Sequence, residues 1–568
     1  MNGTTRRSAM IQAASGAALG LCASQARAAA PAVIETPSVD IRALIEAERG
    51  RIRQAMATNG VEGAAVCLIH GGAPVWVEGF GVTDGASGRE VGADTIFSIQ
   101  STSKNVTAAA VMVAVQRGLL DLDEPITRYL PGFTVQSRFE PRPQDRITLR
   151  LLLSHRAGFT HEAPIGNNYE PAFADFEAHV RSISRTWLRY PVGERYRYSN
   201  LGFDLAGYIL QVRTARPFAD WVQSVLFEPL GMTDSTVATE VYAARTNRAV
   251  GHQHGHDSVP LRTPLIPSGG VYTSARDMAA YAMFHLGRGR AGETVILRED
   301  LWREMHGFGL GGDYGFGVIR EERRYGEVPV RLLSHKGGGF GFGSVFDYCP
   351  EAGLAWVALF NRPADAAYGF GADLVNGALV RRYGARRPRL VPSDLAPIAP
   401  PPALLEPLVG TYVGRNANAT ITLEAGKLIF HQDDLTAPLG SSAPDEVFAV
   451  ASDGELQTYR RCPATTLAPA HLECSVGEAS LDYNDGPDVP AGRADPSWSR
   501  HVGRYQVFQW GVPAIDVTVR VKDGYLYLND TRLIVETQPG LFFTADGEAV
   551  DFRQHPPTWK NLRLQPAA

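Results

Sequence analysis

The most informative stretch of the sequence is TIFSIQSTSKNVTAAAVMVAVQRG, residues Thr95–Gly118. From Lys104 to Arg117 the sequence has helical periodicity and is strongly apolar, and the run ends at Gly118. A helix that is apolar all round is expected to be buried. Ser101 then falls at the first turn of this helix, and Lys104 lies three residues further on, on the same face.

A serine and a lysine in this relation can perform nucleophilic chemistry. A serine hydroxyl is a poor nucleophile unless a base lies within hydrogen-bond reach. Lysine normally titrates near 10.4, so it must be neutral to act as that base, and burial in an apolar helix face would promote the neutral form. The helix N-terminus also favours negative charge that develops near Ser101. The Ser-x-x-Lys spacing alone is weak, because such a short pattern recurs by chance.

Two further motifs follow in order along the chain. Tyr198-Ser199-Asn200 precedes another apolar helical run, and His335-Lys336-Gly337-Gly338 lies on a strand-like run. With Ser101 and Lys104, these motifs resemble the serine β-lactamase and penicillin-binding protein superfamily, specifically its class C β-lactamase-like branch of D-aminopeptidases and esterases. The phrases LLLSHRAGF, LFEPLGMTDST and PSGGVYTSARDM match that branch as well.

The resemblance implies a role for each motif residue. Ser101 would be the acylated nucleophile, and Lys104 would accept its proton or tune Tyr198. Tyr198 would pass the proton to the leaving group and activate water for deacylation, and the formal base stays open between Lys104 and Tyr198. Asn200 would hydrogen-bond the substrate amide and Lys104. The backbone N–H groups of Ser101 and Gly338 would form the oxyanion hole.

The third motif departs from the pattern of many lactamases, which begin it with lysine. His335 is mostly neutral at pH 7 by its reference pKa near 6.5, so it lacks the permanent charge that holds a β-lactam carboxylate. Strong β-lactam turnover is therefore not expected. Gly337 lacks a side chain, as do its two successors, so that a substrate can lie along this strand edge. His155 is expected to be a structural hydrogen-bonding residue.

The length and the proline distribution predict several domains. At about 150 residues per domain, the 568 residues correspond to about three or four folding units. Six prolines fall in RRPRLVPSDLAPIAPPPALL, which favours an extended spacer. We expect an α/β (α+β) sandwich, with a mainly antiparallel sheet flanked by helices, at residues 29–386. A Pro-rich linker at 387–404 and two small antiparallel β-barrels at 405–485 and 497–568 would follow.

The two C-terminal pieces have similar sequences. LVGTY matches HVGRY, GKLIF matches GYLYL, EVFAV matches LFFTA, and LDY matches VDF, in the same order. These are short β-rich runs separated by turn residues. Internal duplication of a barrel explains the similarity better than coincidence.

The first 28 residues resemble a twin-arginine export signal. Arg6 and Arg7 precede an uncharged, weakly apolar stretch of small residues, and Ala26-Arg27-Ala28 suits cleavage after Ala28. We therefore expect a periplasmic or secreted protein, with no membrane span after removal of the signal peptide.

Four of the five cysteines lie beyond this segment. Cys462 and Cys474 lie in a region expected to form a hairpin, and a disulfide between them is as plausible as two thiols. Cys67 and Cys349 lie in apolar, strand-like runs, and we expect buried free thiols there.

Composition excludes several function classes. The formal net charge of −5 is too small to suggest binding to nucleic acid. No nucleotide fingerprint occurs. The alternating His252, His254 and His256 could share one face of a strand, but they lack a carboxylate partner. We expect no metal and no cofactor.

The sequence therefore predicts a serine hydrolase that works through an acyl-enzyme, most simply a peptidase or amidase on small peptides with D- or non-standard residues, such as linearised non-ribosomal peptides. An esterase or weak β-lactamase with the same residues is one alternative, and a penicillin-binding sensor that stays acylated is another. Residues 161–190 are expected to wall the cleft and select the substrate.

Overall fold

The computed structural model describes most of the chain beyond its first forty residues. The described residues are 41–170, 175–261, 264–307, 314–387, 399–414, 418–432, 435–450, 456–464, 469–474, 481–486 and 492–567. The export signal predicted for residues 1–28 and most of the linker predicted for 387–404 lie outside them. Among the described residues, no helix combines the length and the apolar composition needed to cross a membrane.

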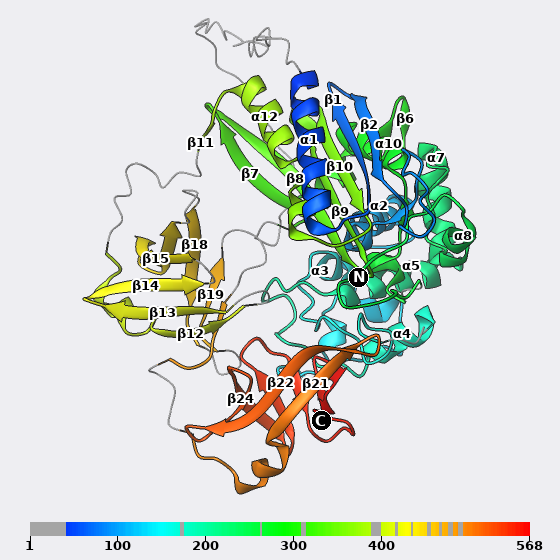
Figure 1. Cartoon of the computed structure of the whole chain (residues 1–568). Helices are drawn as coiled ribbons and strands as arrows, with labels where there is room; N and C mark the ends of the chain where they lie inside the picture. Colours follow the sequence, from blue (N-terminus) through cyan, green and yellow to red (C-terminus); the bar gives the residue numbers. More distant parts are fainter. Residues whose placement is uncertain are drawn as a thin grey trace, which may run out of the picture. The chain divides into compact units, whose positions relative to one another are not determined.

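A central sheet organises the first part of the chain (Figure 1). In spatial order its strands are β11, β7, β8, β9, β10, β1 and β2, and every neighbouring pair is antiparallel. Their bounds are β1 (Gly63–His70), β2 (Ala73–Gly81), β7 (Ile319–Tyr325), β8 (Val328–Gly339), β9 (Phe342–Cys349), β10 (Leu354–Phe360) and β11 (Arg386–Arg387). The predicted mainly antiparallel sheet is thereby confirmed.

Helices cover both faces of this sheet. They are α1 (Ile41–Asn59), α2 (Ser103–Gln116), α3 (Leu149–Leu153), α4 (Phe176–Ile183), α5 (Asn200–Thr214), α6 (Phe218–Val222), α7 (Glu228–Leu230), α8 (Thr239–Ala244), α9 (Ile266–Gly269), α10 (Ala275–Leu286), α11 (Glu299–Met305) and α12 (Ala372–Tyr383). Figure 1 shows α1 and α12 side by side, and the two helices contact each other. Two short strand pairs lie outside the sheet, β3 (Phe97–Ser98) with β4 (Tyr272–Thr273) and β5 (Arg290–Ala291) with β6 (Thr294–Val295).

Alternation along β1 explains why the sheet has a core on each side. Ala64, Val66 and Leu68 contribute to a core with residues of α1 and α12. The intervening residues, among them Ala65 and Cys67, contribute to a larger core with α2, α5 and α10. A strand buried on both faces must be apolar throughout, as GAAVCLIH is. The α/β sandwich predicted from the sequence is confirmed.

The decisive helix begins slightly earlier than predicted. Helix α2 starts at Ser103 rather than at Lys104, and its residues are buried through Ala114. Ser101 lies not in the α-helix but in the 3₁₀ turn η1 (Gln100–Thr102) that leads into it. Gln100 has a positive φ of 48°, a conformation that redirects the chain from β3 into this turn. The predicted first helical turn is therefore tighter than an α-helical one.

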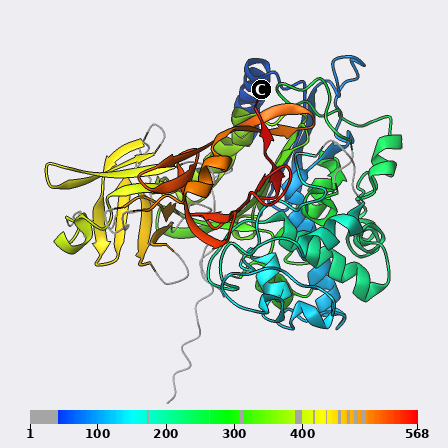
Figure 2. The ribbon, with the colours of Figure 1, turned by 90° about the horizontal axis from the view of Figure 1, so that it is seen from below.

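Two nearly closed antiparallel barrels follow, as predicted (Figures 1 and 2). A single-turn helix, α13 (Pro402–Leu405), precedes the first barrel. The first barrel contains β12 (Gly410–Val413), β13 (Ala419–Glu424), β14 (Lys427–Gln432), β15 (Leu435–Pro438), β16 (Gly440–Ala443), β17 (Glu446–Val450), β18 (Leu456–Cys462), β19 (His471–Cys474) and β20 (Leu481–Tyr483). The second, coloured orange to red in Figure 2, contains β21 (Gly503–Gln509), β22 (Val512–Lys522), β23 (Tyr525–Leu528), β24 (Thr531–Gln538), β25 (Leu541–Thr544), β26 (Ala549–Asp551), β27 (Thr558–Trp559), β28 (Leu562–Arg563) and β29 (Gln565–Pro566).

The two barrels share details that support an internal duplication. In each, the first strand pairs with the next strand and with the last, β12 with β13 and β20, and β21 with β22 and β29. The hydroxyl of Tyr412 donates to the carbonyl of Leu408 at 2.9 Å, and that of Tyr505 donates to the carbonyl of His501 at 3.0 Å. The first matched motif thus forms the first strand of each barrel, with the same tyrosine anchor, whereas LDY lies on β20 beside β12 and VDF lies on β26 between β25 and β27.

The cysteines are free where they are described. Cys67 and Cys349 are buried thiols, as predicted, and Cys462 is a free thiol. A bridge between Cys462 and Cys474 is therefore absent, although β18 and β19 do form the expected hairpin. In that hairpin Cys462 pairs with His471, whereas Cys474 pairs with Tyr459. The three-residue offset amounts to about 10 Å along the strands, which is beyond the reach of a disulfide.

Candidate active site

Ser101 and Lys104 lie together at the start of α2. The Lys104 side chain is completely buried, and its Nζ donates to Ser101 Oγ at 3.2 Å. The same Nζ donates to Asn200 Oδ1 at 2.7 Å and to the carbonyl of Ser268 at 2.9 Å. An amine held this way by three acceptors has a fixed position, so the geometry permits proton exchange with the serine hydroxyl.

Tyr198 and Asn200 reach the lysine from the start of α5. Lys104 Nζ lies 4.7 Å from the centroid of the Tyr198 ring. Ser199, between them, caps α5 by accepting from the N–H of Leu201 at 3.1 Å. The cap fixes the point at which the chain turns into the helix, and so places Tyr198 just before it and Asn200 on its first turn.

His155 supports this turn. Its Nδ1 accepts from the backbone N–H of Ser199 at 3.1 Å, and its ring lies 4.4 Å from that of Tyr198. His155 is 2% exposed. The prediction that His155 is a structural hydrogen-bonding residue is confirmed. His155 orients Ser199, which immediately precedes Asn200 in the candidate site.

The third motif lies on β8, beside Ser101. A Cβ added to Gly337 would lie 2.0 Å from the carbonyl oxygen of Ile99 and 3.0 Å from the Ser101 nitrogen, so only glycine fits there. Strand β7 pairs with β8 only as far as Ser334. Beyond that point, from His335 to Gly339, no described strand pairs with β8 on the side where β7 lies. Gly338 is exposed on this edge. The backbone at Gly338 is thus exposed, whereas Gly337 is buried and its carbonyl accepts from the Tyr368 hydroxyl at 3.1 Å.

His335 points into the protein. It is 2% exposed, its Nε2 lies 2.9 Å from the hydroxyl of Tyr314, and its Nδ1 lies 2.8 Å from the carbonyl of Lys336. Because a carbonyl only accepts, Nδ1 carries the proton and Nε2 accepts from Tyr314. Burial, assisted by the charge of Lys104, lowers the pKa of His335 to about 3. The ring is therefore neutral, as the sequence predicts, and both of its nitrogens are engaged.

A cavity of about 330 Å³ opens beside Tyr198 and Gly338. The segment 161–190 contributes His161, Glu162, Asn168, Tyr169 and Arg189 to its wall, which confirms that this segment lines the cleft. The second barrel supplies further lining residues, which residue type and spacing could not assign to the site. They include Gln509, Trp510, Asp546, Glu548, Trp559 and Lys560.

Specific contacts join this barrel to the cavity wall. Arg189 pairs with Asp546 at 2.9 Å and with Glu548 at 3.1 Å, and the hydroxyl of Thr160 donates to Glu548 at 2.6 Å. Glu162 is also buried, and although burial alone raises the pKa of a carboxyl, the contact with His161 holds the pKa of Glu162 below its usual value. Three carboxylates therefore face the cavity or its rim.

Ser268 and Asp204 are functional candidates that the sequence did not single out. The carbonyl of Ser268 accepts from Lys104, and its N–H donates to Asp204 Oδ1 at 3.0 Å. Asp204 Oδ2 contacts Nε2 of the fully buried His179 at 3.1 Å. Ser268 lies in the phrase PSGGVYTSARDM, which matches sequences of the family. Its backbone carbonyl binds Lys104, and because every residue has such a carbonyl, the residue type could not reveal this role.

The alternating histidines near residue 254 do not share a strand. The segment around His252, His254 and His256 forms turns and bends, and His252 lies 3.2 Å from the carboxylate of Glu62. The expected single face is therefore not formed.

Comparison with known proteins agrees with the fold and the motifs. The family model described as Beta-lactamase matches residues 49–378. The chain is 24% identical over 355 residues to the D-alanyl-D-alanine-carboxypeptidase/endopeptidase AmpH of Escherichia coli, covering 59% of this chain and 88% of AmpH. It is 26% identical to Beta-lactamase-like protein 4 of Dictyostelium discoideum, covering 42% of this chain but only 44% of that protein.

A solved structure matches a longer part of the chain. The crystal structure of SurE aligns with a TM-score of 0.56 at 22% identity and covers 78% of this chain and 98% of SurE. This likeness concerns the fold. The family match, which spans more than half of the sequence and includes all three motifs, places the chain in the β-lactamase family of serine hydrolases.

Proposed function

We propose that Ser101 is the nucleophile of an acyl-enzyme mechanism. The observation that carries the proposal is the 3.2 Å contact between the buried Lys104 Nζ and Ser101 Oγ, because a neutral amine at that place can accept the proton of a hydroxyl that would otherwise be inert. In its neutral form the amine takes the hydroxyl proton as Oγ attacks the carbonyl carbon. The backbone N–H groups of Ser101 and Gly338 stabilise the oxyanion, a contribution of about 3 to 4 kcal/mol for such donors.

The later steps involve Tyr198 and Asn200. Tyr198 lines the cavity beside Gly338 and lies over the lysine, where it can relay the proton to the leaving group and then activate the deacylating water. Asn200 holds Lys104 through its Oδ1. Its amide nitrogen is a donor for the substrate carbonyl.

The substrate class that this site suits best is a small peptide or amide with D- or non-standard residues. Residues of the second barrel line part of the 330 Å³ cavity and narrow the access to it, which favours a small substrate over a folded protein chain. The exposed edge of β8 at Gly338 can hydrogen-bond a short peptide. AmpH, whose name describes a D-alanyl-D-alanine carboxypeptidase and endopeptidase, is a relative with this kind of substrate.

Esterase or weak β-lactamase activity is the alternative with the same residues. The neutral, inward-facing His335 offers no charge to a β-lactam carboxylate, which disfavours efficient lactamase turnover. A sensor that stays acylated is the third possibility. A panel of para-nitroanilides of D- and L-amino acids against para-nitrophenyl esters separates peptidase from esterase, and the lifetime of a penicillin adduct separates enzyme from sensor.

Labelling with a fluorophosphonate and peptide mass spectrometry test the nucleophile. The adduct should map to Ser101, and Ser101→Ala should abolish both labelling and turnover. The control variant Ser103→Ala should still be labelled. It removes a hydroxyl two residues away that accepts from the N–H of Val271. Unchanged turnover in Ser101→Ala would refute the mechanism.

We also propose that the protein is exported. The support is the sequence of residues 1–28, with Arg6-Arg7 before an uncharged stretch. Replacement of both arginines by lysine should retain the protein in the cytoplasm, as measured by cell fractionation.

A further inference from the structure

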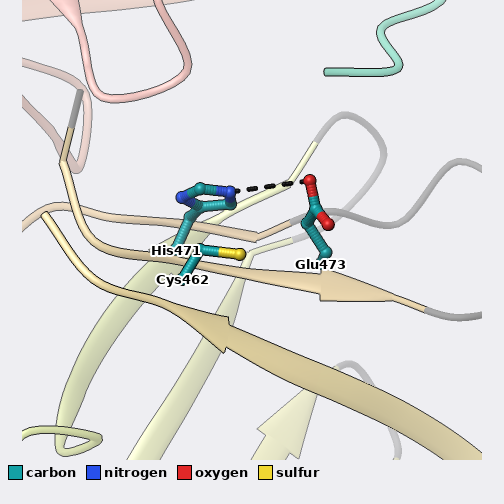
Figure 3. A group of neighbouring side chains, drawn as sticks. All are labelled: Cys462, His471 and Glu473. Atoms are coloured by element: carbon teal, nitrogen blue, oxygen red, sulfur yellow. Dashed lines mark ion pairs between the residues drawn. The ribbon is translucent and has the colours of Figure 1, made fainter. Parts of the chain in front are cut away.

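Three possible metal ligands lie together on the first barrel, far along the chain from the serine. Cys462 on β18 pairs directly with His471 on β19, and Glu473 lies two residues beyond His471. Directly opposed residues and residues two apart share a face of a sheet, so all three side chains lie on one side. Their donor atoms all lie within 4.8 Å of one another, and Figure 3 shows the imidazole and the carboxylate facing each other beside the sulfur.

The imidazole of His471 has an unsatisfied nitrogen. His471 is 7% exposed, and its Nε2 is buried without a hydrogen-bond partner. The other ring nitrogen, Nδ1, lies 3.4 Å from the carbonyl of Pro469. A carbonyl beside Nδ1 places the proton there, which leaves a lone pair on Nε2. Burying a ring nitrogen with an unused lone pair costs free energy unless a hydrogen-bond donor or a metal ion contacts it. In histidines that bind metals, a carbonyl beside the other ring nitrogen orients the ring in the same way.

The Glu473 carboxylate has one oxygen that remains available. Its Oε2 accepts from Arg460 at 2.8 Å, whereas Oε1 lies 3.8 Å from His471 Nε2. The Cys462 thiol is free, with a long contact of 4.0 Å to the carbonyl of Arg460. One sulfur, one nitrogen and one oxygen donor thus converge on the same space.

We propose that Cys462, His471 and Glu473 form a zinc-binding site. Thiolate, imidazole and carboxylate are the donors that Zn²⁺ takes in proteins, and three protein ligands leave a fourth position for water. Donor atoms around a tetrahedral zinc lie about 3.4 to 3.6 Å apart, so the His471–Glu473 separation of 3.8 Å needs only a small contraction. On binding, the thiol releases its proton to solvent as the sulfur–zinc bond forms.

Nearby charges are balanced in a way that tolerates a cation. Asp482, which pairs with His471 across β20 and β19, is completely buried and accepts from Arg195 at 2.7 Å. Asp482 also pairs with Arg197 at 2.6 Å, and Arg195 pairs with Glu194 at 3.0 Å, so the two arginines are balanced by two carboxylates. Arg460 remains paired with the oxygen of Glu473 that does not face the imidazole. The thiolate and the carboxylate then supply the charge that the zinc ion requires.

Protonation of His471 competes with the metal. A thiol and an imidazole bind zinc only in their deprotonated forms, so protons compete with the metal for Cys462 and His471. In the absence of metal, the protonated imidazole and the Glu473 carboxylate can form a simple ion pair. Zinc affinity is therefore expected to fall as the pH is lowered.

The test is a metal titration of the full-length, chelator-treated protein. Zn²⁺ competition against a chromophoric chelator should show one tight site, and Co²⁺ should give a near-ultraviolet sulfur-to-metal charge-transfer band. Cys462→Ser, His471→Asn and Glu473→Gln should each weaken zinc binding by roughly tenfold or more. Cys462→Ser should also abolish the cobalt band.

A matched control lies in the same barrel. His431 and Glu424 form an exposed pair at 3.7 Å, and no cysteine belongs to it. His431→Asn should leave both readouts unchanged, as should Cys349→Ser. The proposal fails if the unmodified protein binds zinc no better than Cys462→Ser does, or gives no cobalt band. The cobalt measurement uses the unmodified chain, so it tests the zinc site even if a variant does not fold. Fluorophosphonate labelling of Ser101 tests the proposed hydrolase activity separately.

Discussion

At the scale of single residues, the position of Lys104 depends on groups drawn from distant parts of the chain. Its Nζ bonds Ser101, Asn200 and the carbonyl of Ser268. The Ser268 backbone is fixed in turn by Asp204 through its N–H. We therefore regard Asp204 as a positioning residue, because it acts on the lysine through a peptide group and not directly.

Asp204→Asn should impair catalysis more than substrate binding. Loss of the carboxylate weakens the bonds to the Ser268 N–H and to His179, and the Ser268 carbonyl then no longer fixes Lys104. We expect kcat to fall by roughly 10- to 100-fold with little change in KM, since small misplacements of catalytic groups have effects of this size. The alkaline limb of the kcat profile should also move.

Asp277→Asn is the matched control for this variant. Asp277 is likewise a buried carboxylate that accepts from a backbone N–H, that of Asp234, and from a hydroxyl, that of Ser235. Its substitution should lower stability without moving the pH profile of kcat. Equal effects of both variants on that profile would show that Asp204 has only a structural role.

At the scale of elements, the approach of β8 to η1 builds the site. Gly337 touches Ile99 and the Ser101 nitrogen, so the strand and the turn can only be this close if the strand carries no side chain there. The periodicity of the sequence predicts both elements, but not the distance between them.

Gly337→Ala should therefore disrupt the site. The added Cβ would lie 2.0 Å from the Ile99 carbonyl oxygen, and neither backbone can yield without displacing Ser101. We expect kcat/KM to fall roughly 100-fold. Gly132→Ala, at a glycine with nothing within 4 Å of the added atom, should have little effect on kcat/KM. Near-normal activity of Gly337→Ala would contradict the arrangement.

Helix α11 ends in a buried histidine that makes the domain sensitive to acid. His306 bonds the carbonyl of Trp302 at 2.6 Å and the hydroxyl of Tyr348 at 2.7 Å, and burial lowers its pKa to about 4. Between pH 6.5 and pH 4 the unfolded chain binds a proton here and the folded chain does not, so the free energy of unfolding falls as pH falls.

The expected size of this effect can be measured. At pH 5 the loss relative to pH 7 should be about 2 kcal/mol for one such histidine. His306→Gln should be less stable at pH 7 but should lose less stability between pH 7 and pH 5, as followed by urea unfolding. The exposed His254→Gln should leave the pH dependence as it is in the unmodified protein. An identical pH dependence in His306→Gln would contradict the assignment.

At the scale of the whole molecule, buried ion pairs connect the barrels to the catalytic domain. In the first barrel, Asp482 is completely buried and accepts from Tyr190 at 2.8 Å, Arg195 at 2.7 Å and Arg197 at 2.6 Å. These three donors lie in the segment that leads directly to Tyr198. The barrel thus supports the chain from which the candidate phenol projects.

Asp482→Asn should destabilise this connection strongly. It removes the carboxylate of the buried Arg197 and one of the two carboxylates of Arg195, which costs about 3–5 kcal/mol for a broken buried pair. We expect a lower unfolding midpoint, faster proteolysis between the domains and reduced kcat. Asp530→Asn, which removes the exposed ion pair with Arg520 at 2.9 Å, should change stability by only about 0–1 kcal/mol. Equal stability of the two variants would refute a supporting role for Asp482.

The secondary-structure elements and the local motif geometry could be predicted from the amino-acid sequence. Helical periodicity placed Ser101 and Lys104 one turn apart, strand alternation predicted the sheet and the barrels, and matching phrases revealed the duplication. These features depend on neighbours in the chain, so residue type and spacing suffice to predict them.

Contacts between groups that lie far apart in the chain could not be predicted from the sequence, because they depend on packing. The Ser268 carbonyl and Asp204 at the lysine, the carboxylates of the second barrel at the cavity, and the grouping of Cys462, His471 and Glu473 all depend on packing between segments far apart in sequence. The predicted disulfide alternative failed for the same reason, because strand register, set by the pairing of β18 with β19, opposes Cys462 to His471 and not to Cys474.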